Sequence, residues 1–193
     1  MTMAKVYVFL ADGFEDVEAL IPIDVLRRGG VDVVTVSVMN GSQVVESAHN
    51  VQIVADAMAE DCNFGDADLL LLPGGMPGAS NLYNSPVVRQ ALKEQAAANK
   101  RIAAICAAPA VVLAQMGLLD GRNATCYPGF EQMFAQRGVR YTGTLVTIDG
   151  NITTAEGPAA AFPFAYELLS QLVDVYTAGQ IAEGMRFKHL MEG

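Results

Sequence analysis

With 193 residues, the chain has the length of one domain with a substantial core, and we expect residues 1–193 to form a single domain. The net charge of −9 disfavours nucleic acid and anionic membranes as partners, because both need a basic face. No apolar run approaches the roughly 18 residues that cross a bilayer, and the first residues lack a signal-peptide pattern, so we expect a cytoplasmic protein.

Strand-like and helix-like segments alternate along the chain, which predicts an α/β fold with a mostly parallel sheet between helices. The expected strands are 5–10, 31–39, 69–72, 101–105 and 123–127, with hairpins at 43–54 and 145–155. The expected helices are 14–28, 86–99, 107–116, 130–136, 160–173 and 177–188. Ser85 and Pro86 mark the start of the second helix as cap and first helical residue.

The cysteines and histidines favour neither a disulfide framework nor a metal centre. Cys62, Cys106 and Cys126 form no C-x-x-C pair, as expected of free thiols in a reducing compartment. His49 and His189 are too few and too far apart in sequence for a metal cluster. We expect no metal and no cofactor. A flavin-phosphate site is disfavoured because acidic residues follow the first strand.

Cys106 stands between an apolar strand and a predicted helix, with Ala104, Ala107 and Ala108 around it. A sharp strand-to-helix turn holds its apex residue in a strained conformation, with the side chain exposed above the sheet. The N–H groups and dipole of the following helix are expected to lower the pKa of a thiol at this apex. The alternative is a small buried residue, and the local pattern does not decide between them. Cys62 and Cys126 lack this setting.

Glu18 is an unusual carboxyl because it lies on the apolar face of the first predicted helix. At 100° per residue, Phe14, Glu18, Ile21 and Val25 fall within roughly 60° of one another. A buried carboxyl is costly unless it is protonated or paired. A protonated Glu18 would donate a hydrogen bond to a Cys106 thiolate. Alternatively, Glu18 caps a backbone amide near the helix start.

The third feature is Pro73-Gly74-Gly75 at the end of a short apolar strand. Glycines at this place let backbone N–H groups approach a reacting atom, as in an oxyanion hole. A simple tight turn is the alternative, and the sequence alone favours it.

Four segments together resemble the ThiJ/PfpI superfamily in its DJ-one-like branch. They are LADGFEDVEALIPIDVLRRGG at 10–30, LLPGG at 71–75, AAICAAP at 103–109 and EGPA at 156–159. They span nearly the whole chain in the correct order. The resemblance implies a flavodoxin-like, doubly wound three-layer sandwich that usually forms a homodimer.

The resemblance also implies roles for individual residues. Cys106 matches the reactive cysteine and Glu18 its protonated partner, while the amides of Gly75 and Ala107, beside Gly74, match oxyanion-stabilising positions. Arg28 matches an arginine at the dimer interface near the cysteine. Pro158, in the last matching segment, is a possible pocket residue.

The chain departs from the family pattern at Tyr127. Hydrolase-like and glyoxalase-like members carry a histidine just before a proline near the cysteine, and here Tyr127 precedes Pro128. A phenol with a pKa of about 10 is a poor general base at neutral pH, which argues against a Cys-His protease and against efficient glyoxalase turnover. His49 lies where the branch often has an arginine. It either approaches Cys106, for instance across a dimer interface, or is a surface histidine.

Two functions remain. The first is a stress-response redox sensor or chaperone-like protein in which an oxidant converts Cys106 to sulfenate and then sulfinate. The second is a glyoxalase- or deglycase-like enzyme that adds Cys106 to a small reactive carbonyl such as methylglyoxal, with Glu18 moving the proton. The missing histidine is needed for turnover but not for oxidation, so the sequence favours the first.

Overall fold

The computed structural model describes residues 3–187 and 189, and its centre is a seven-stranded sheet with the order β10-β11-β7-β6-β1-β2-β5. The strands are β1 (Lys5–Leu10), β2 (Asp32–Ser37), β5 (Ala57–Met58), β6 (Leu69–Leu72), β7 (Arg101–Ile105), β10 (Val146–Asp149) and β11 (Ile152–Ala155). All pairs are parallel except β10 with β11. The run β2-β1-β6-β7-β11 has the flavodoxin-like order, so the predicted fold class is confirmed.

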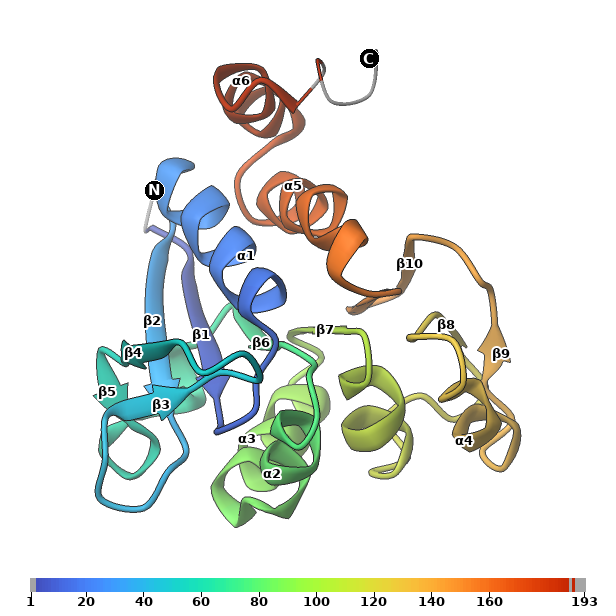
Figure 1. Ribbon diagram of the computed structural model, residues 1–193. Helices are drawn as coiled ribbons and strands as arrows, with labels where there is room; N and C mark the ends of the chain where they lie inside the picture. The colour runs from blue at the N-terminus through green and yellow to red at the C-terminus, as the bar shows by residue number, and fades with distance from the viewer. Residues whose placement is uncertain (1–2, 188, 190–193) are drawn as a thin grey trace.

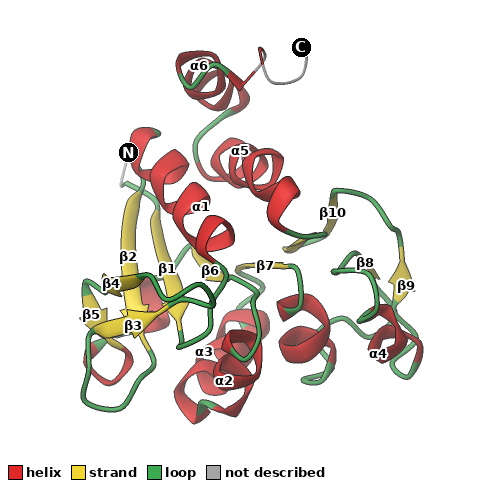
Figure 2. Cartoon of the chain, in the orientation of Figure 1, coloured by secondary structure: helices red, strands yellow, loops and turns green. Residues whose placement is uncertain are grey.

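Helices cover both faces of this sheet and make the three layers visible in Figures 1 and 2. α1 (Asp16–Arg28) and α5 (Ala161–Leu172) lie side by side on one face, and α6 (Val175–Gly184) packs on α5. α2 (Gly78–Asn84), α3 (Pro86–Ala97) and the π-helix η3 (Pro109–Ala114) lie on the other face. None of these helices, in the part of the chain that the structure describes, is long and apolar enough to span a membrane.

The smaller elements stand outside the main sheet. β3 (Val44–Glu46) and β4 (Gln52–Val54) form an antiparallel hairpin, and β8 (Asn123–Ala124) pairs in parallel with β9 (Arg140–Tyr141). The remaining helical segments are α4 (Glu131–Ala135) and the short 3-10 turns η1 (Ala59–Asp61), η2 (Phe64–Asp66) and η4 (Pro158–Ala160).

The strong apolar runs became the central strands because helices cover them on both faces. All four leucines of β6 are fully buried. The predicted start of α3 is also confirmed, since the Ser85 side chain accepts a hydrogen bond from Val88 N and Pro86 is the first helical residue. The 145–155 hairpin is confirmed as β10 and β11.

Several predicted boundaries were wrong. The strand expected at 123–127 is only β8, because the chain turns away toward Tyr127 after two paired residues. The helix expected at 107–116 is the π-helix η3 and begins later, because the chain first completes the turn at Cys106. The last helix, expected to end at Lys188, ends at Gly184; Lys188 itself lies outside the described residues.

Candidate active site

Three loops converge at the carboxyl ends of neighbouring parallel strands. The β1–α1 connection leads to Glu18, the segment after β6 contains Gly74 and Gly75, and Cys106 follows β7 directly. The chain leaves β1 toward β2 on one side, and β6 lies on the other. Such a switch point is where doubly wound sheets bind ligands.

Cys106 occupies the sharp turn that the sequence predicts. Its φ angle is 65°, a left-handed conformation that costs a non-glycine residue free energy. Two backbone hydrogen bonds hold the turn: Cys106 N donates to Ala155 O at 2.9 Å, and Tyr127 N donates to Cys106 O at 2.8 Å. The expected exposure was wrong, because neighbouring chain covers the residue and leaves it 9% exposed.

Glu18 is fully buried beside Cys106, as its place on the apolar face predicts. One carboxyl oxygen, Oε2, accepts a hydrogen bond from Gly74 N at 3.0 Å. The carboxyl and the Cys106 thiol interact through a hydrogen bond that shifts the pKa of both groups. Oε1 is buried and has no hydrogen-bond partner among the described residues. Glu18 does not cap the start of α1. The cap is Glu15, whose side chain accepts a hydrogen bond from Glu18 N at 2.9 Å.

Gly74 and Gly75 are required by close packing around this pair. A Cβ on Gly74 would lie 2.6 Å from both Cys106 Cβ and Glu18 Oε2. Gly75 has a φ angle of 85°, and a Cβ there would lie 2.5 Å from Glu15 N. The backbone N–H groups of Gly75 and Ala107 form hydrogen bonds with the Cys106 sulfur. The loop therefore makes a tight turn and also presents a backbone N–H group to the sulfur.

Burial and mutual charge govern the titration of the pair. Burial raises the pKa of Glu18 to about 7, and the Glu15 charge adds to this, while hydrogen bonds with Cys106 and Gly74 oppose it. Burial also raises the pKa of Cys106 to about 12, and the Glu18 carboxylate is the next cause; the Gly75 and Ala107 amides oppose both. The expected lowering of the thiol pKa is thus wrong, because burial outweighs the opposing amides. Because two adjacent negative charges repel, the pair carries at most one negative charge near neutral pH.

Tyr127 and Pro158 flank the turn. The Tyr127 backbone is bonded to Cys106, and its ring packs against Gly157, where a Cβ would lie 3.0 Å from Tyr127 Cδ2. Pro158 follows β11, the strand next to β7, and is half-buried. We find no hydrogen bond between the Tyr127 hydroxyl and Cys106 among the described residues.

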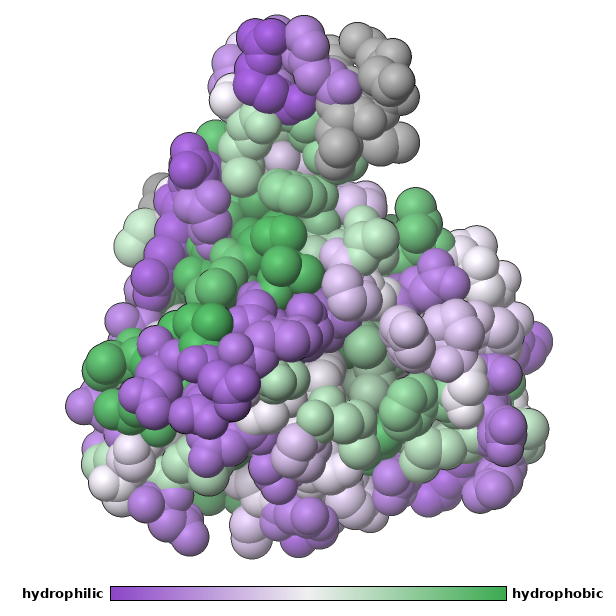
Figure 3. All heavy atoms as spheres, viewed as in Figure 1, coloured by the Kyte–Doolittle hydropathy of each residue, from purple (hydrophilic) through white to green (hydrophobic). Residues whose placement is uncertain are grey.

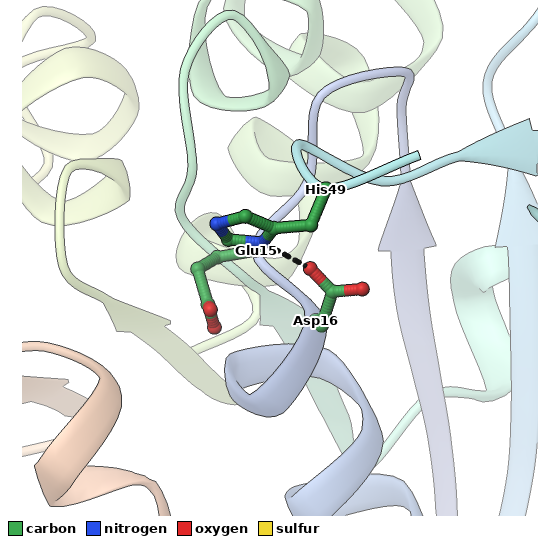
Figure 4. A group of neighbouring side chains, drawn as sticks. All are labelled: Glu15, Asp16 and His49. Atoms are coloured by element: carbon green, nitrogen blue, oxygen red, sulfur yellow. Dashed lines mark hydrogen bonds and ion pairs between the residues drawn. The ribbon is translucent and has the colours of Figure 1, made fainter. Parts of the chain in front are cut away.

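His49 lies near the start of α1 but pairs with an acid. Its Nδ1 is 2.6 Å from Asp16 Oδ2, as Figure 4 shows, and Asp16 Oδ1 accepts from Ser47 Oγ at 2.7 Å. In the described part of the chain, no hydrogen bond joins His49 to Cys106. An approach across a dimer interface stays a prediction.

Arg28 lies at the opposite end of α1 from Glu18, about 15 Å along the helix axis at 1.5 Å per residue. It is exposed and pairs with Asp24, with 2.9 Å between Nε and Oδ2. Within one chain it does not reach the cysteine. Its predicted place at a dimer interface stays a prediction.

The group formed by Glu15, Asp16 and His49 went unrecognised in the sequence. Its three nearest oxygen and nitrogen atoms lie within 4.8 Å of one another. Two of them already form the Asp16–His49 hydrogen bond, and the positive end of α1 disfavours a cation there. The group is an electrostatic cluster beside Glu18. The only sequence signal was the run of three acids at 15, 16 and 18.

Comparisons with known proteins agree with this geometry. The sequence pattern of the DJ-1/PfpI family matches residues 4–171. A Danio rerio protein named Parkinson disease protein 7 homolog is 39% identical over 183 residues, which cover 94% of this chain and 96% of the relative. A Caenorhabditis elegans protein named glutathione-independent glyoxalase DJR-1.2 is 34% identical over 158 residues, covering 82% of each chain.

A solved structure gives the same result for the fold. The structure of oxidized Toxoplasma gondii DJ-1 superimposes with a TM-score of 0.89 at 37% sequence identity, covering 94% of this chain and 97% of the other. The similarity therefore extends over nearly the whole chain and includes the central sheet and its helical layers.

Proposed function

The chain belongs to the DJ-1/PfpI family, and from that premise we propose that it is a DJ-1-like stress-response protein whose Cys106 reacts with oxidants. The observation that carries the proposal is the pairing of a strained, nearly buried cysteine with a fully buried carboxyl. The chemistry uses no cofactor. The oxidant is the small-molecule partner.

In the reactive state the negative charge lies on the Cys106 sulfur and the proton lies on Glu18. Two backbone N–H groups, from Gly75 and Ala107, bond to sulfur, whereas one, from Gly74, bonds to the carboxyl. Glu18 is 0% exposed and Cys106 is 9% exposed, so charge on Glu18 is the more strongly desolvated. A protonated Glu18 also removes the carboxylate charge that raises the pKa of Cys106.

The oxidation follows from this state. The thiolate attacks one oxygen of hydrogen peroxide, an S–O bond forms as the O–O bond breaks, and the products are sulfenate and water. A second peroxide converts sulfenate to sulfinate and releases another water. Glu18 donates its hydrogen bond to the sulfur or to the new oxygen throughout, and the Gly75 and Ala107 amides stabilise the charge.

Intact-mass analysis tests this proposal. After mild peroxide treatment, the wild type should gain one and then two oxygens, and Cys106→Ser should gain none at the same dose. An equal mass gain in both proteins would sink the proposal.

A glyoxalase-like activity is the second candidate, favoured by the printed name of the Caenorhabditis elegans relative. The Cys106 thiolate would add to the aldehyde carbon of methylglyoxal, forming a C–S bond and an alkoxide that takes the Glu18 proton. The amides of Gly75 and Ala107 would stabilise that alkoxide. Tyr127, His49 or water would have to supply the base for later steps.

Consumption of methylglyoxal decides between the candidates. The oxidant-sensing proposal expects no enzymatic consumption by the wild type above that of Cys106→Ser. Consumption that depends on both Cys106 and Glu18 would establish the glyoxalase-like enzyme instead. Normal consumption in Glu18→Ala would rule out the mechanism given for it.

We further propose that the protein is a cytoplasmic homodimer with chaperone-like capacity under stress. Two apolar side chains of α1 are partly exposed, Val17 at 39% and Leu20 at 41%. Figure 3 shows hydrophobic surface over the region of α1 and α5. A second copy that covers this face would remove the exposed apolar surface from water.

A further inference from the structure

Three hydrogen bonds form a closed ring behind the reactive pair. Glu18 N donates to Glu15 Oε2 at 2.9 Å, Glu15 N donates to Gly74 O at 3.1 Å, and Gly74 N donates to Glu18 Oε2 at 3.0 Å. Gly74 also packs against Cys106 Cβ. Glu15 thus positions both groups that flank the cysteine on this side, the Glu18 carboxyl and the glycine loop.

The Glu15 carboxylate acts unequally on the two members of the pair. Its side chain caps the helix turn that contains Glu18, and its negative charge raises the pKa of Glu18. The charges and hydrogen bonds that set the pKa of Cys106 come instead from Glu18, Gly75 and Ala107. A charge that penalises ionised Glu18 more than ionised Cys106 moves the single negative charge of the pair toward sulfur.

His49 faces Glu15 from a different element, the turn between β3 and β4. Figure 4 shows its ring above Glu15, with Nδ1 bonded to Asp16. The charged groups around the ring are Asp16 and Glu15, both at the start of α1, and together they raise the pKa of His49, Asp16 most. Protonated His49 therefore offsets the negative charge of Glu15, and neutral His49 does not.

We propose that Glu15 is a positioning residue that keeps the shared proton on Glu18, and that His49 adjusts this effect with pH. The inference rests on the proposed function, because it concerns the reactivity of Cys106. As pH rises and His49 loses its proton, the Glu15 charge acts unopposed, ionised Glu18 becomes less favourable, and the fraction of Cys106 thiolate increases.

Alkylation of Cys106 by iodoacetamide measures this fraction without any oxidant or carbonyl substrate. Glu15→Gln keeps an oxygen that can accept from Glu18 N but removes the charge. We expect its rate at pH 7 to fall roughly three- to tenfold, which corresponds to about half to one pH unit. Glu94→Gln is the matched control, because Glu94 is an exposed acid of α3 on the other face of the sheet, where it accepts from Gln90. Its rate should match the wild type.

His49→Gln tests the pH effect while keeping a donor for Asp16. Compared with the wild type, it should react faster below the pKa of His49 and equally fast above it. An unchanged rate in Glu15→Gln, an equal fall in Glu94→Gln, or a His49→Gln profile parallel to the wild type would overturn the inference. If the wild type itself alkylates no faster than a simple unperturbed thiol, the proposed function fails instead.

Discussion

At the scale of the residue, Cys106 and Glu18 share one charge inside a nearly closed site. A thiol 9% exposed and a carboxyl 0% exposed cannot both ionise readily, because each lacks water and each repels the other. Backbone amides therefore decide where the charge rests. Gly75 and Ala107 direct theirs at sulfur, which favours the thiolate with neutral Glu18 that we propose as the reactive form.

This burial links stability to pH. Glu18 titrates near 7 in the folded chain and near 4.5 ordinarily, so between these pH values the folded chain keeps a proton that the unfolded chain has lost. Stability should therefore fall as pH rises from 4.5 to 7, by about 3 kcal/mol at most, and then level off. Urea unfolding of the wild type and Glu18→Gln at several pH values checks this. A similar pH dependence in both proteins would contradict it.

The sequence located these two residues because their signals are local. A strand that ends on Cys106 before a helix, and Glu18 on an apolar helix face, are patterns within a few positions of the chain. The raised thiol pKa and the cap by Glu15 were missed, because they depend on distances between three loops that sequence spacing does not give. His49 was noticed, but its partner Asp16 lies 33 positions away.

At the scale of the element, the segment after β6 is as important as the cysteine turn. Gly74 brings its backbone against Cys106 and Glu18, and Gly75 adopts a positive φ so that its N–H faces sulfur. A side chain at Gly74 would enter the space that the reactive pair occupies.

Gly74→Ala should therefore destabilise the fold by about 2–3 kcal/mol, since the new Cβ would lie 2.6 Å from two atoms of the pair. It should also slow Cys106 alkylation. Gly179→Ala is the control: Gly179 lies in α6 with no atom within 4 Å of the added Cβ, and alanine favours helices by up to about 1 kcal/mol. Thermal unfolding of both variants measures the difference. Equal stability would mean that the loop can shift at little cost.

The central strands were predictable because apolar runs covered on both faces leave a plain signal. α2 was missed because its sequence, GASNLYN, has no apolar periodicity and no side-chain cap. β5 and β9 each contain two residues, too few for a pattern. The π-helical form of η3 depends on hydrogen bonds around the Cys106 turn, which residue types alone do not specify.

At the scale of the whole molecule, the sheet order places β1, β6 and β7 side by side, so that loops far apart in sequence meet at one edge. The resemblance of four segments to one family predicted this order, and the structure confirms it. The single domain over residues 1–193 and the assembly of two copies stay predictions.

The proposed dimer gives a measurement of its own. Val17 and Val87 are each the second residue of a helix, are equally exposed at 39%, and lie on opposite faces of the sheet. If α1 forms the interface, Val17→Glu should sediment as a monomer, whereas Val87→Glu and the wild type should sediment as dimers. Analytical ultracentrifugation distinguishes these outcomes. A monomeric wild type, or a dimer in both variants, would contradict this assignment.

We propose that Cys106 is the oxidation-sensitive residue because of its strained turn and its buried carboxyl partner, and not because of its accessibility. Cys62 is more exposed than Cys106, and Cys126 is fully buried, so accessibility alone would direct peroxide to Cys62. The most direct test is peptide mass spectrometry after graded peroxide treatment of the wild type. We predict one and then two oxygens on the Cys106 peptide while the other two thiols stay unmodified. Oxidation of Cys62 first, or equal oxidation of all three, would contradict the account.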